Sequence, residues 1–196
     1  MLQVDRIVNS IFDSITWLLS ETESNQVWLV DCGDIVPILQ KTKGKTVAGV
    51  LLTHAHFDHI YGLPELINLF PECKIYTNDA GLIALADARQ NMSLYHESPV
   101  IVKGKPLIIC NDGDEIKVYP DVSARIYETP GHHPSCLTFE VGDYLFTGDA
   151  YIPGVKVVTN LPGGNKADAK ASKERIEEMM SSYQLCAGHS QNESCL

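Results

Sequence analysis

The sequence predicts a single α/β domain built from two similar halves. Strand-like and helical segments alternate in the first half of the chain, as in a sheet covered by helices. The halves also echo each other, because residues 28–34 (W-L-V-D-C-G-D) and 144–149 (Y-L-F-T-G-D) each end a strand in an aspartate beside a glycine turn. With 196 residues, 44% of them hydrophobic, the chain has enough apolar material for one core, and we expect one domain over residues 1–196.

In the first half, three strands and two helices are expected. The strands are residues 15–19, 27–30 and 46–52. The third contains the unbroken apolar run V-A-G-V-L-L, which is typical of a strand buried on both faces of a sheet. Helical periodicity follows at residues 63–69, where Pro64 suits a first turn, and at residues 81–89.

The second half predicts a series of short strands followed by one long helix. The strands are residues 107–110, 116–119, 125–129, 137–141 and 144–146. A D-G-D turn at Asp112 separates the first two, and turn signals of this kind favour hairpins. The helix is expected at residues 165–180.

The acidic balance of the chain argues against nucleic acid and membrane surfaces as partners. Fifteen Lys and Arg residues stand against 25 Asp and Glu residues, a formal net charge of -10 at pH 7. Two basic clusters are interpreted as a solvated turn and as the solvated face of a helix. They are Lys41, Lys43 and Lys45, and then Lys166, Lys170, Lys173 and Arg175. We therefore expect a small-molecule substrate, no nucleic acid and no membrane.

A soluble, cytoplasmic protein is expected. Asp5, Arg6 and Asp13 interrupt the first twenty residues where a secretory signal needs an apolar core, and no later run approaches membrane-spanning length. The six cysteines contain no C-x-x-C pair, which argues against a thiolate zinc site and a disulfide framework. They are Cys32, Cys73, Cys110, Cys136, Cys186 and Cys195. The oligomeric state is not indicated by the sequence.

The segment T-H-A-H-F-D-H, residues 53–59, is the strongest chemical signal in the chain. His54 and His56 are two apart, so in an extended loop their side chains project to the same side and can bind one ion. Asp58 and His59 follow where the chain turns toward the next helix, so they aim elsewhere. One loop can therefore supply ligands to two adjacent ions.

Three further ligand candidates follow predicted strands, each directly after a glycine. They are His132 in T-P-G-H, Asp149 in F-T-G-D and His189 in A-G-H. A donor set of imidazoles and carboxylates without thiolate suits zinc, and also manganese or iron. A lone histidine such as His96 or His133 is more simply a packed or surface residue. The cluster at residues 53–59 is different, because burying it without an ion leaves polar groups unpaired at about 1–3 kcal/mol each.

These motifs, in this order, resemble the metallo-β-lactamase fold superfamily of hydrolases. The resemblance includes V-D-C-G-D at residues 30–34 and N-M-S at residues 91–93, and covers nearly the whole chain. It implies a four-layer αββα sandwich with two divalent metal ions at its edge. The implied ligands are His54, His56 and His132 for the first ion, Asp58, His59 and His189 for the second, and Asp149 as a bridge. Asp31 would orient ligands from behind or simply close its turn.

Such a centre hydrolyses substrates with activated water. Two ions about 3.5 to 4 Å apart lower the pKa of a shared water from 15.7 towards ~7 and so create a bridging hydroxide nucleophile. Asp58, the catalytic candidate, would bind the second ion and also carry a proton.

The substrate class expected is a small thioester or ester. L-P-G-G-N at residues 161–165 is similar to the glyoxalase II-like (hydroxyacylglutathione hydrolase-like) thioesterases, although Val158-Thr159-Asn160 stands where that group usually has Arg-Thr-Asp. That group also binds glutathione with a helical segment after the last ligand histidine, and seven residues follow His189 here. Substrate contacts are therefore expected elsewhere, at Tyr95, Tyr151 or Lys156.

Other activities of the same fold stay open. A lactonase or phosphodiesterase would use the same two ions, although the acidic charge disfavours nucleic acid as a substrate. A mononuclear iron enzyme like the persulfide dioxygenases would be an oxidoreductase instead. The complete set of seven ligand candidates favours two ions.

Overall fold

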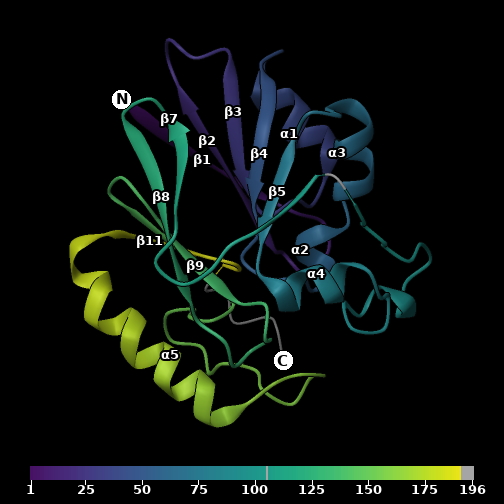
Figure 1. Cartoon of the computed structure of the whole chain (residues 1–196), viewed down its shortest axis with the longest axis vertical. Coiled ribbons are helices and arrows are strands. Elements are labelled where there is room, and N and C mark those ends of the chain that lie inside the picture. Colours follow the sequence, from purple (N-terminus) through teal and green to yellow (C-terminus); the bar gives the residue numbers. More distant parts are fainter. Residues whose placement is uncertain (105, 191–196) are drawn as a thin grey trace.

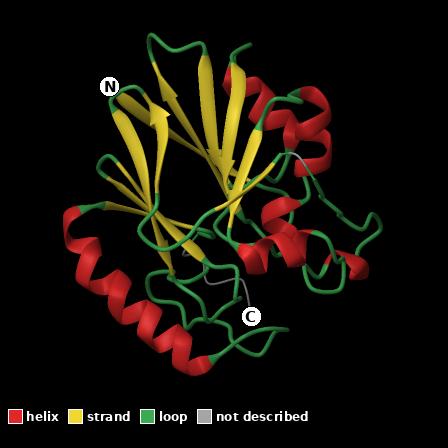
Figure 2. Ribbon diagram, viewed as in Figure 1, coloured by secondary structure: helices red, strands yellow, loops and turns green. Residues whose placement is uncertain are grey.

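Two sheets stand face to face with helices on their outer sides, as Figure 1 and Figure 2 show. The computed structural model describes residues 1–104 and 106–190. Helices α1 to α4 cover the first sheet and α5 (Lys166–Met179) covers the second, which gives four layers in the order αββα. The predicted α/β sandwich is thus confirmed. None of the helices within the described ranges has both the length and the apolar character that a bilayer crossing needs.

The first sheet has six strands in the order β1-β2-β3-β4-β5-β6. The strands β1, β2 and β3 are antiparallel neighbours, and β3 to β6 run parallel. Their bounds are Leu2–Val8 (β1), Ile15–Glu21 (β2), Gln26–Val30 (β3), Thr46–Leu51 (β4), Lys74–Thr77 (β5) and Leu107–Ile109 (β6). The helices that cover this sheet are Ile35–Thr42 (α1), Phe57–Ile60 (α2), Leu63–Leu69 (α3) and Asp79–Leu85 (α4), and a 3-10 turn η1 follows at Ser93–Tyr95.

The second sheet has five strands in the order β11-β10-β9-β8-β7. Neighbours are antiparallel except for β10 and β11, which are parallel because α5 and the 3-10 turn η2 (Met180–Ser182) cross between them. The bounds are Glu115–Tyr119 (β7), Val122–Glu128 (β8), Leu137–Val141 (β9), Tyr144–Gly148 (β10) and Gln184–Ala187 (β11).

The core between the sheets consists of side chains from both inner faces. Val30 and Leu51 from the first sheet pack in one cluster with Ile126, Phe139 and Phe146 from the second. All five are completely buried, and each contributes roughly 1.5–3 kcal/mol of burial free energy. This packing holds the strand ends, from which the loops of the candidate site emerge, in one arrangement.

The structure adds elements that the sequence did not predict. β1, α1, β5 and β11 were not expected, and α2 occupies part of the histidine motif where only a turn was expected. The helix expected at residues 81–89 spans Asp79–Leu85, because Asn78 accepts a hydrogen bond from the Gly81 backbone and so caps its start. It ends before Asp87, which accepts a hydrogen bond from the backbone of Arg89. The cysteines in the described ranges are buried free thiols, and Cys195 lies outside those ranges.

Candidate metal centre

All seven ligand candidates meet at one edge of the sandwich. Each lies on a loop or a short helix that follows a strand, so the two sheets bring together residues far apart in the sequence. They are His54 and His56 after β4, Asp58 and His59 in α2, His132 after β8, Asp149 after β10 and His189 after β11.

His54, His56 and His132 form a first group whose ligand atoms lie within 4.8 Å of one another. His132 donates its Nδ1–H to the carbonyl oxygen of Val158 at 2.9 Å, so its Nε2 carries a lone pair. That Nε2 lies 2.8 Å from Nδ1 of His56. Two imidazole nitrogens this close repel each other unless a cation or a proton lies between them.

The third member of this group, His54, is held through a relay. Thr53 donates its hydroxyl hydrogen to Oδ2 of Asp31 at 2.7 Å, so its Oγ1 accepts from Nδ1 of His54 at 3.2 Å. This leaves Nε2 of His54 as the free lone pair, and it is buried with no hydrogen-bond partner among the described residues. The relay therefore leaves Nε2 of His54 free to bind an ion, although this atom is buried from solvent.

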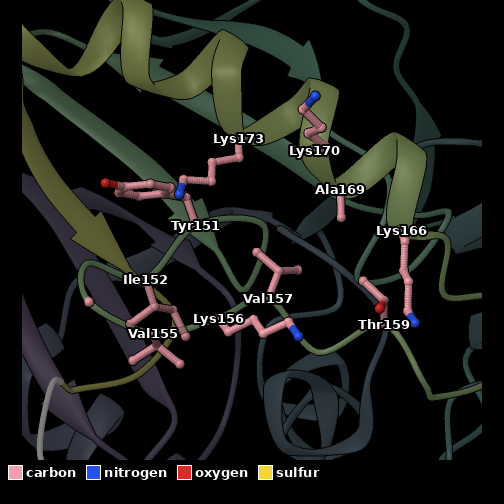
Figure 3. A pocket seen from close by; sticks show the side chains of 11 residues that line it. Tyr151, Ile152, Val155, Lys156, Val157, Thr159, Lys166, Ala169, Lys170 and Lys173 are labelled. Atoms are coloured by element: carbon pink, nitrogen blue, oxygen red, sulfur yellow. The ribbon is translucent and has the colours of Figure 1, made fainter.

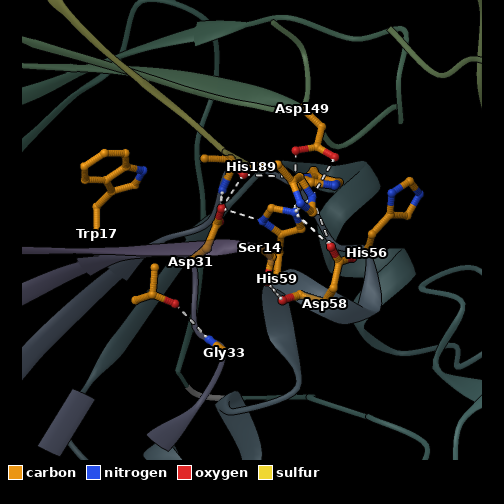
Figure 4. A network of polar contacts seen from close by, with 12 residues as sticks. Ser14, Trp17, Asp31, Gly33, His56, Asp58, His59, Asp149 and His189 are labelled. Atoms are coloured by element: carbon orange, nitrogen blue, oxygen red, sulfur yellow. Dashed lines mark hydrogen bonds and ion pairs between the residues drawn. The ribbon is translucent and has the colours of Figure 1, made fainter. Parts of the chain in front are cut away.

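Asp58, His59 and His189 form the second group, again within 4.8 Å (Figure 4). His59 donates its Nδ1–H to Oδ2 of Asp31 at 2.8 Å, and His189 donates its Nδ1–H to the carbonyl oxygen of Phe12 at 2.9 Å. Their Nε2 atoms then face each other at 3.3 Å, and Oδ2 of Asp58 lies 3.3 and 3.2 Å from them. The three atoms converge on one point, as the ligands of a single ion do.

Asp149 lies between the two groups. Its Oδ2 is 3.6 Å from Nε2 of His132 in the first group and 3.4 Å from Nε2 of His189 in the second. Its Oδ1 is 3.6 Å from Nε2 of His59, and this oxygen is buried without a hydrogen-bond partner in the part of the chain described. One carboxylate therefore contacts both groups, which is the position of a bridging ligand.

The electrostatics of the two groups differ. Burial, followed by repulsion from His132 and His133, lowers the pKa of His56 to about 3. Burial likewise lowers the pKa of His54, so these two imidazoles favour the neutral form. Burial also opposes charge on His189, but Asp149 and Asp58 outweigh it and raise its pKa to about 10. The second group therefore favours a positive charge beside its carboxylates.

The residues present fit divalent metal ions. Nε2 of His54, unpartnered in the described chain, would gain a partner if cations occupied the two groups, and so would the facing nitrogens of His56 and His132 and the carboxylate of Asp149. Left unsatisfied, these groups cost free energy. The atoms offered are imidazole nitrogens and carboxylate oxygens, a set that suits zinc, manganese or iron.

Asp31 connects the two groups from behind. Besides His59 and the Thr53 hydroxyl, it accepts the backbone N–H of Thr53 at 2.7 Å, and it is itself in the left-handed region with φ 60°. These contacts would serve both roles that the sequence left open for this residue, orienting ligands and shaping its turn.

Two contributors have no counterpart in the sequence prediction. Ser135 accepts the backbone N–H of Ala55, which lies between His54 and His56, at 3.0 Å. Its hydroxyl also donates to Nδ1 of His133 at 2.6 Å, whereas Phe12 acts through its backbone carbonyl. The short H-P-S spacing, residues 133–135, could have indicated the contact between Ser135 and His133. A contact made by a backbone carbonyl, such as that of Phe12, leaves no pattern of side chains in the sequence.

The three expected substrate contacts separate in the structure. Tyr151 and Lys156 line a cavity of about 530 Å³, and Lys156 also lines a small pocket of about 30 Å³ together with His132 and Asp149. Tyr95 is 74% exposed on η1 and is not among the residues that line either space.

Comparisons with known proteins agree with this architecture. A hydroxyacylglutathione hydrolase of Photorhabdus laumondii is 28% identical over 93% of this chain and 64% of its own length. The chain thus spans about three fifths of the length of the curated relatives it matches. Among solved structures, the BLEG-1 B3 metallo-β-lactamase is similar with a TM-score of 0.82 and 21% identity, covering 96% of this chain and 92% of that one. TTHA1623 in a di-iron-bound form is similar with a TM-score of 0.79 and 22% identity, covering 95% and 92%. The family description "Metallo-beta-lactamase superfamily" matches residues 16–189, so the chain belongs to the metallo-β-lactamase superfamily.

Proposed function

We propose that this chain is a dinuclear metal-dependent hydrolase that cleaves a small thioester or ester. The observation that carries the proposal is the position of Asp149, whose carboxylate contacts ligand atoms of both groups. His54, His56 and His132 would hold one divalent ion, and Asp58, His59 and His189 the other, with Asp149 shared. Zinc is the ion that we expect, with iron or manganese as the alternatives.

Two such ions, when bound, acidify a shared water and stabilise charge on the substrate carbonyl. Asp58 then accepts the proton of the attacking water and releases it to the leaving group. The water oxygen bonds to the carbonyl carbon while the C–S or C–O bond breaks, and the leaving atom takes the proton. The products are a carboxylic acid and a thiol or alcohol, so atoms and charge balance without an oxidant.

The chain's own residues support this chemistry by holding the ligand set in one protonation state. Asp31 and the carbonyls of Phe12 and Val158 each receive an Nδ1–H and leave Nε2 free. Substrate recognition would come from the cavity side, where Tyr151 and Lys156 lie, with Tyr95 retained as a more distant contact. The thioester class is supported by the relatives that are named hydroxyacylglutathione hydrolase.

A second candidate is a mononuclear iron oxidoreductase of the persulfide dioxygenase type. His54, His59 and Asp149 place two imidazoles and one carboxylate within 4.8 Å of one another, which is the ligand composition of many non-haem iron oxygenases.

Metal analysis and a substrate panel separate these activities. We expect two ions per chain and faster hydrolysis of thioesters than of lactones or bis-p-nitrophenyl phosphate. Faster hydrolysis of lactones or of bis-p-nitrophenyl phosphate would instead assign the enzyme to the lactonases or to the phosphodiesterases. One iron per chain, with oxygen uptake on a persulfide, would instead establish the oxidoreductase.

A further inference from the structure

A strongly basic cavity opens beside the candidate metal centre of this acidic protein. It has a volume of about 530 Å³ and lies between α5 and the loop from β10 to α5 (Figure 3). Lysines contribute four of its lining residues, and none of the lining residues in the described chain is acidic. They are Lys156 from the loop and Lys166, Lys170 and Lys173 from α5. The sequence had suggested that the helical lysines form only a solvated face, whereas here they border a cavity.

The cavity adjoins a smaller pocket at the metal-ligand candidates. This pocket, of about 30 Å³, is lined by His132 and Asp149, and it shares Ile152, Val155, Lys156 and Val157 with the larger cavity. A ligand that occupied both spaces would place its reacting carbonyl at the centre and its far end among the lysines. The shared apolar side chains would contact the part of the ligand between these two ends.

Helix α5 is fastened directly to the loop that carries His132. Ser172 donates its hydroxyl to the carbonyl of Pro130 at 2.6 Å, and the backbone N–H of Asn165 donates to the carbonyl of Gly131 at 2.8 Å. The helix also packs so closely that a Cβ at Gly131 would lie 2.2 Å from the backbone nitrogen of Ala169. The lysines of α5 therefore keep a defined position relative to the metal ligands.

The ammonium groups are available to a ligand. Lys166, Lys170 and Lys173 are spaced four and three residues apart and lie on successive turns of one helix face (Figure 3). Among the described residues, Lys170 and Lys173 make only exposed ion pairs, with Glu174 at 3.8 Å and Glu177 at 3.6 Å, and such pairs are weak. Lys166 begins the helix, where the dipole disfavours a cation and favours an anion.

We propose that this cavity binds the polyanionic end of the substrate, so that the substrate is a thioester whose thiol carries two or more phosphate or carboxylate charges. This inference rests on the proposed function and specifies its substrate class. The cavity volume is within the usual range for small-molecule sites, and several lysines without an opposing acid in the lining attract several negative charges. The lining contains lysine but not arginine, and lysine binds phosphate as a point charge.

Binding can be tested without turnover. S-methyl-coenzyme A offers phosphates, S-methylglutathione offers carboxylates, and S-methyl-N-acetylcysteamine is a neutral thioether of the same kind. We expect calorimetry to show binding of at least one anionic thioether, weakened by salt, and much weaker binding of the neutral one. The stronger of the two anionic ligands identifies phosphate or carboxylate as the recognised group. Equal affinity for the neutral and anionic thioethers, or no binding of either anion, would overturn the proposal.

Matched variants locate the interaction. In Lys166→Ala/Lys173→Ala, the dissociation constant for the anionic thioether should rise about 4- to 25-fold, since each exposed charge contributes a factor of roughly 2 to 5. Lys41→Ala/Lys74→Ala removes the same charge from residues outside the cavity lining and should leave the constant within about twofold. Equal effects of the two double variants would mean that binding depends on the net charge of the protein and not on the lysines of the cavity, which would contradict the proposal.

Kinetics separate this inference from the proposed function. The ratio of kcat/KM for the anionic thioester to that for the neutral N-acetylcysteamine thioester should fall in Lys166→Ala/Lys173→Ala through KM, and Lys→Arg at both positions should restore most of it. An unchanged ratio, with thioesters still hydrolysed, overturns the cavity proposal alone. Salt-sensitive binding of the anion without hydrolysis of any thioester or ester overturns the proposed function and leaves the assignment of the cavity as an anion site standing.

Discussion

His189 donates its Nδ1–H to the carbonyl oxygen of Phe12 across 2.9 Å. A carbonyl can only accept, so this contact fixes the proton on Nδ1 and presents Nε2 to Asp58 and Asp149, at 3.2 and 3.4 Å. Phe12 and Asp13 are the centre of the hairpin turn between β1 and β2, with φ values of 54° and 52°. A left-handed conformation costs a residue such as Phe about 1–2 kcal/mol, and the turn retains it at the candidate site.

The variant Phe12→Pro should therefore bind one metal ion instead of two. Proline holds φ near -65° and cannot adopt the 54° found here, so the turn and its carbonyl must move away from His189. We expect metal content after dialysis to fall from about two ions per chain to about one, because the second group loses the orientation of its histidine. The control Phe12→Asn keeps the carbonyl and tolerates the left-handed region, so it should retain both ions and gain about 1 kcal/mol of stability. Two retained ions in the proline variant would contradict the role of the turn.

Asp31→Asn should weaken metal binding more than it weakens the fold. The carboxylate accepts from Thr53 and from His59, and an amide can replace only part of this because one of its polar atoms is a donor. We expect metal affinity, measured by competition with a chelator, to fall about 10- to 100-fold. Asp34→Asn is the matched control in the same segment, since Asp34 binds Ser10 and Tyr61 and contacts no ligand candidate in the described structure. Equal losses of metal affinity in the two variants would show that Asp31 does not orient the metal ligands.

Asp58→Asn tests the proposed proton transfer. The amide keeps an oxygen that can bind a metal but cannot take a proton from water, so kcat should fall about 100-fold or more. The melting temperature should change little, because the amide has nearly the shape of the carboxylate and keeps one acceptor oxygen. Metal content must be measured in parallel, and a variant with two ions and wild-type kcat would exclude Asp58 as the proton carrier.

The sequence predicted which side chains meet at the candidate centre because the signal for them is local. The spacing in residues 53–59 and the glycine before each of His132, Asp149 and His189 are readable without a structure, and all seven side chains do converge. The family resemblance supplied the four layers, which strand and helix periodicity alone would not have arranged. β1 was missed because the alternation of apolar and polar residues in residues 2–5 breaks at Arg6, and because its edge position exposes much of it.

Other features depend on tertiary packing and carry no sequence signal. The carbonyl of Phe12 could come from any residue, so its contact with His189 follows only from the position of the hairpin. The lysines of α5 have the spacing of an ordinary solvated helix face. The packing of α5 against the loop that carries His132, including the close approach of Gly131 to Ala169, places that face at the border of a cavity.

The ion pair between Arg175 on α5 and Asp112 should stabilise the fold to an extent that depends on pH. Arg175 binds Asp112 through two hydrogen bonds, at 2.6 and 3.1 Å, and Arg175 is the first cause of the lowered pKa of Asp112, opposed by its partial burial. Because the folded pKa lies below the unfolded one, the stabilisation is complete above the unfolded value of 3.8 and is lost as the pH falls through the folded value. The backbone of Glu128 and the charge of Arg125 on β8 act in the same direction.

For this half-exposed pair, we expect Asp112→Asn to cost no more than about 1 kcal/mol at pH 6. Urea unfolding of the metal-free protein measures the difference between wild type and variant at each pH, and the titration of the other groups cancels in that difference. The difference should disappear in acid. A cost that grows as the pH falls would contradict the sign of the shift.

Gly188→Ala should displace the carboxylate of Asp149, the proposed bridge, without replacing any ligand candidate. A Cβ at position 188 would lie 2.2 Å from Oδ1 of Asp149 and 2.9 Å from Cε1 of His59, so Asp149 has to move away from the space between the two groups. Overpacking of this kind costs about 1–3 kcal/mol, and a displaced bridge should weaken binding of both ions by about tenfold or more. Gly154→Ala is the control, because its Cβ meets open space and its φ of 76° adds backbone strain alone. If Gly188→Ala loses stability as the control does but binds both ions with wild-type affinity in a chelator competition, Asp149 does not bridge the centre.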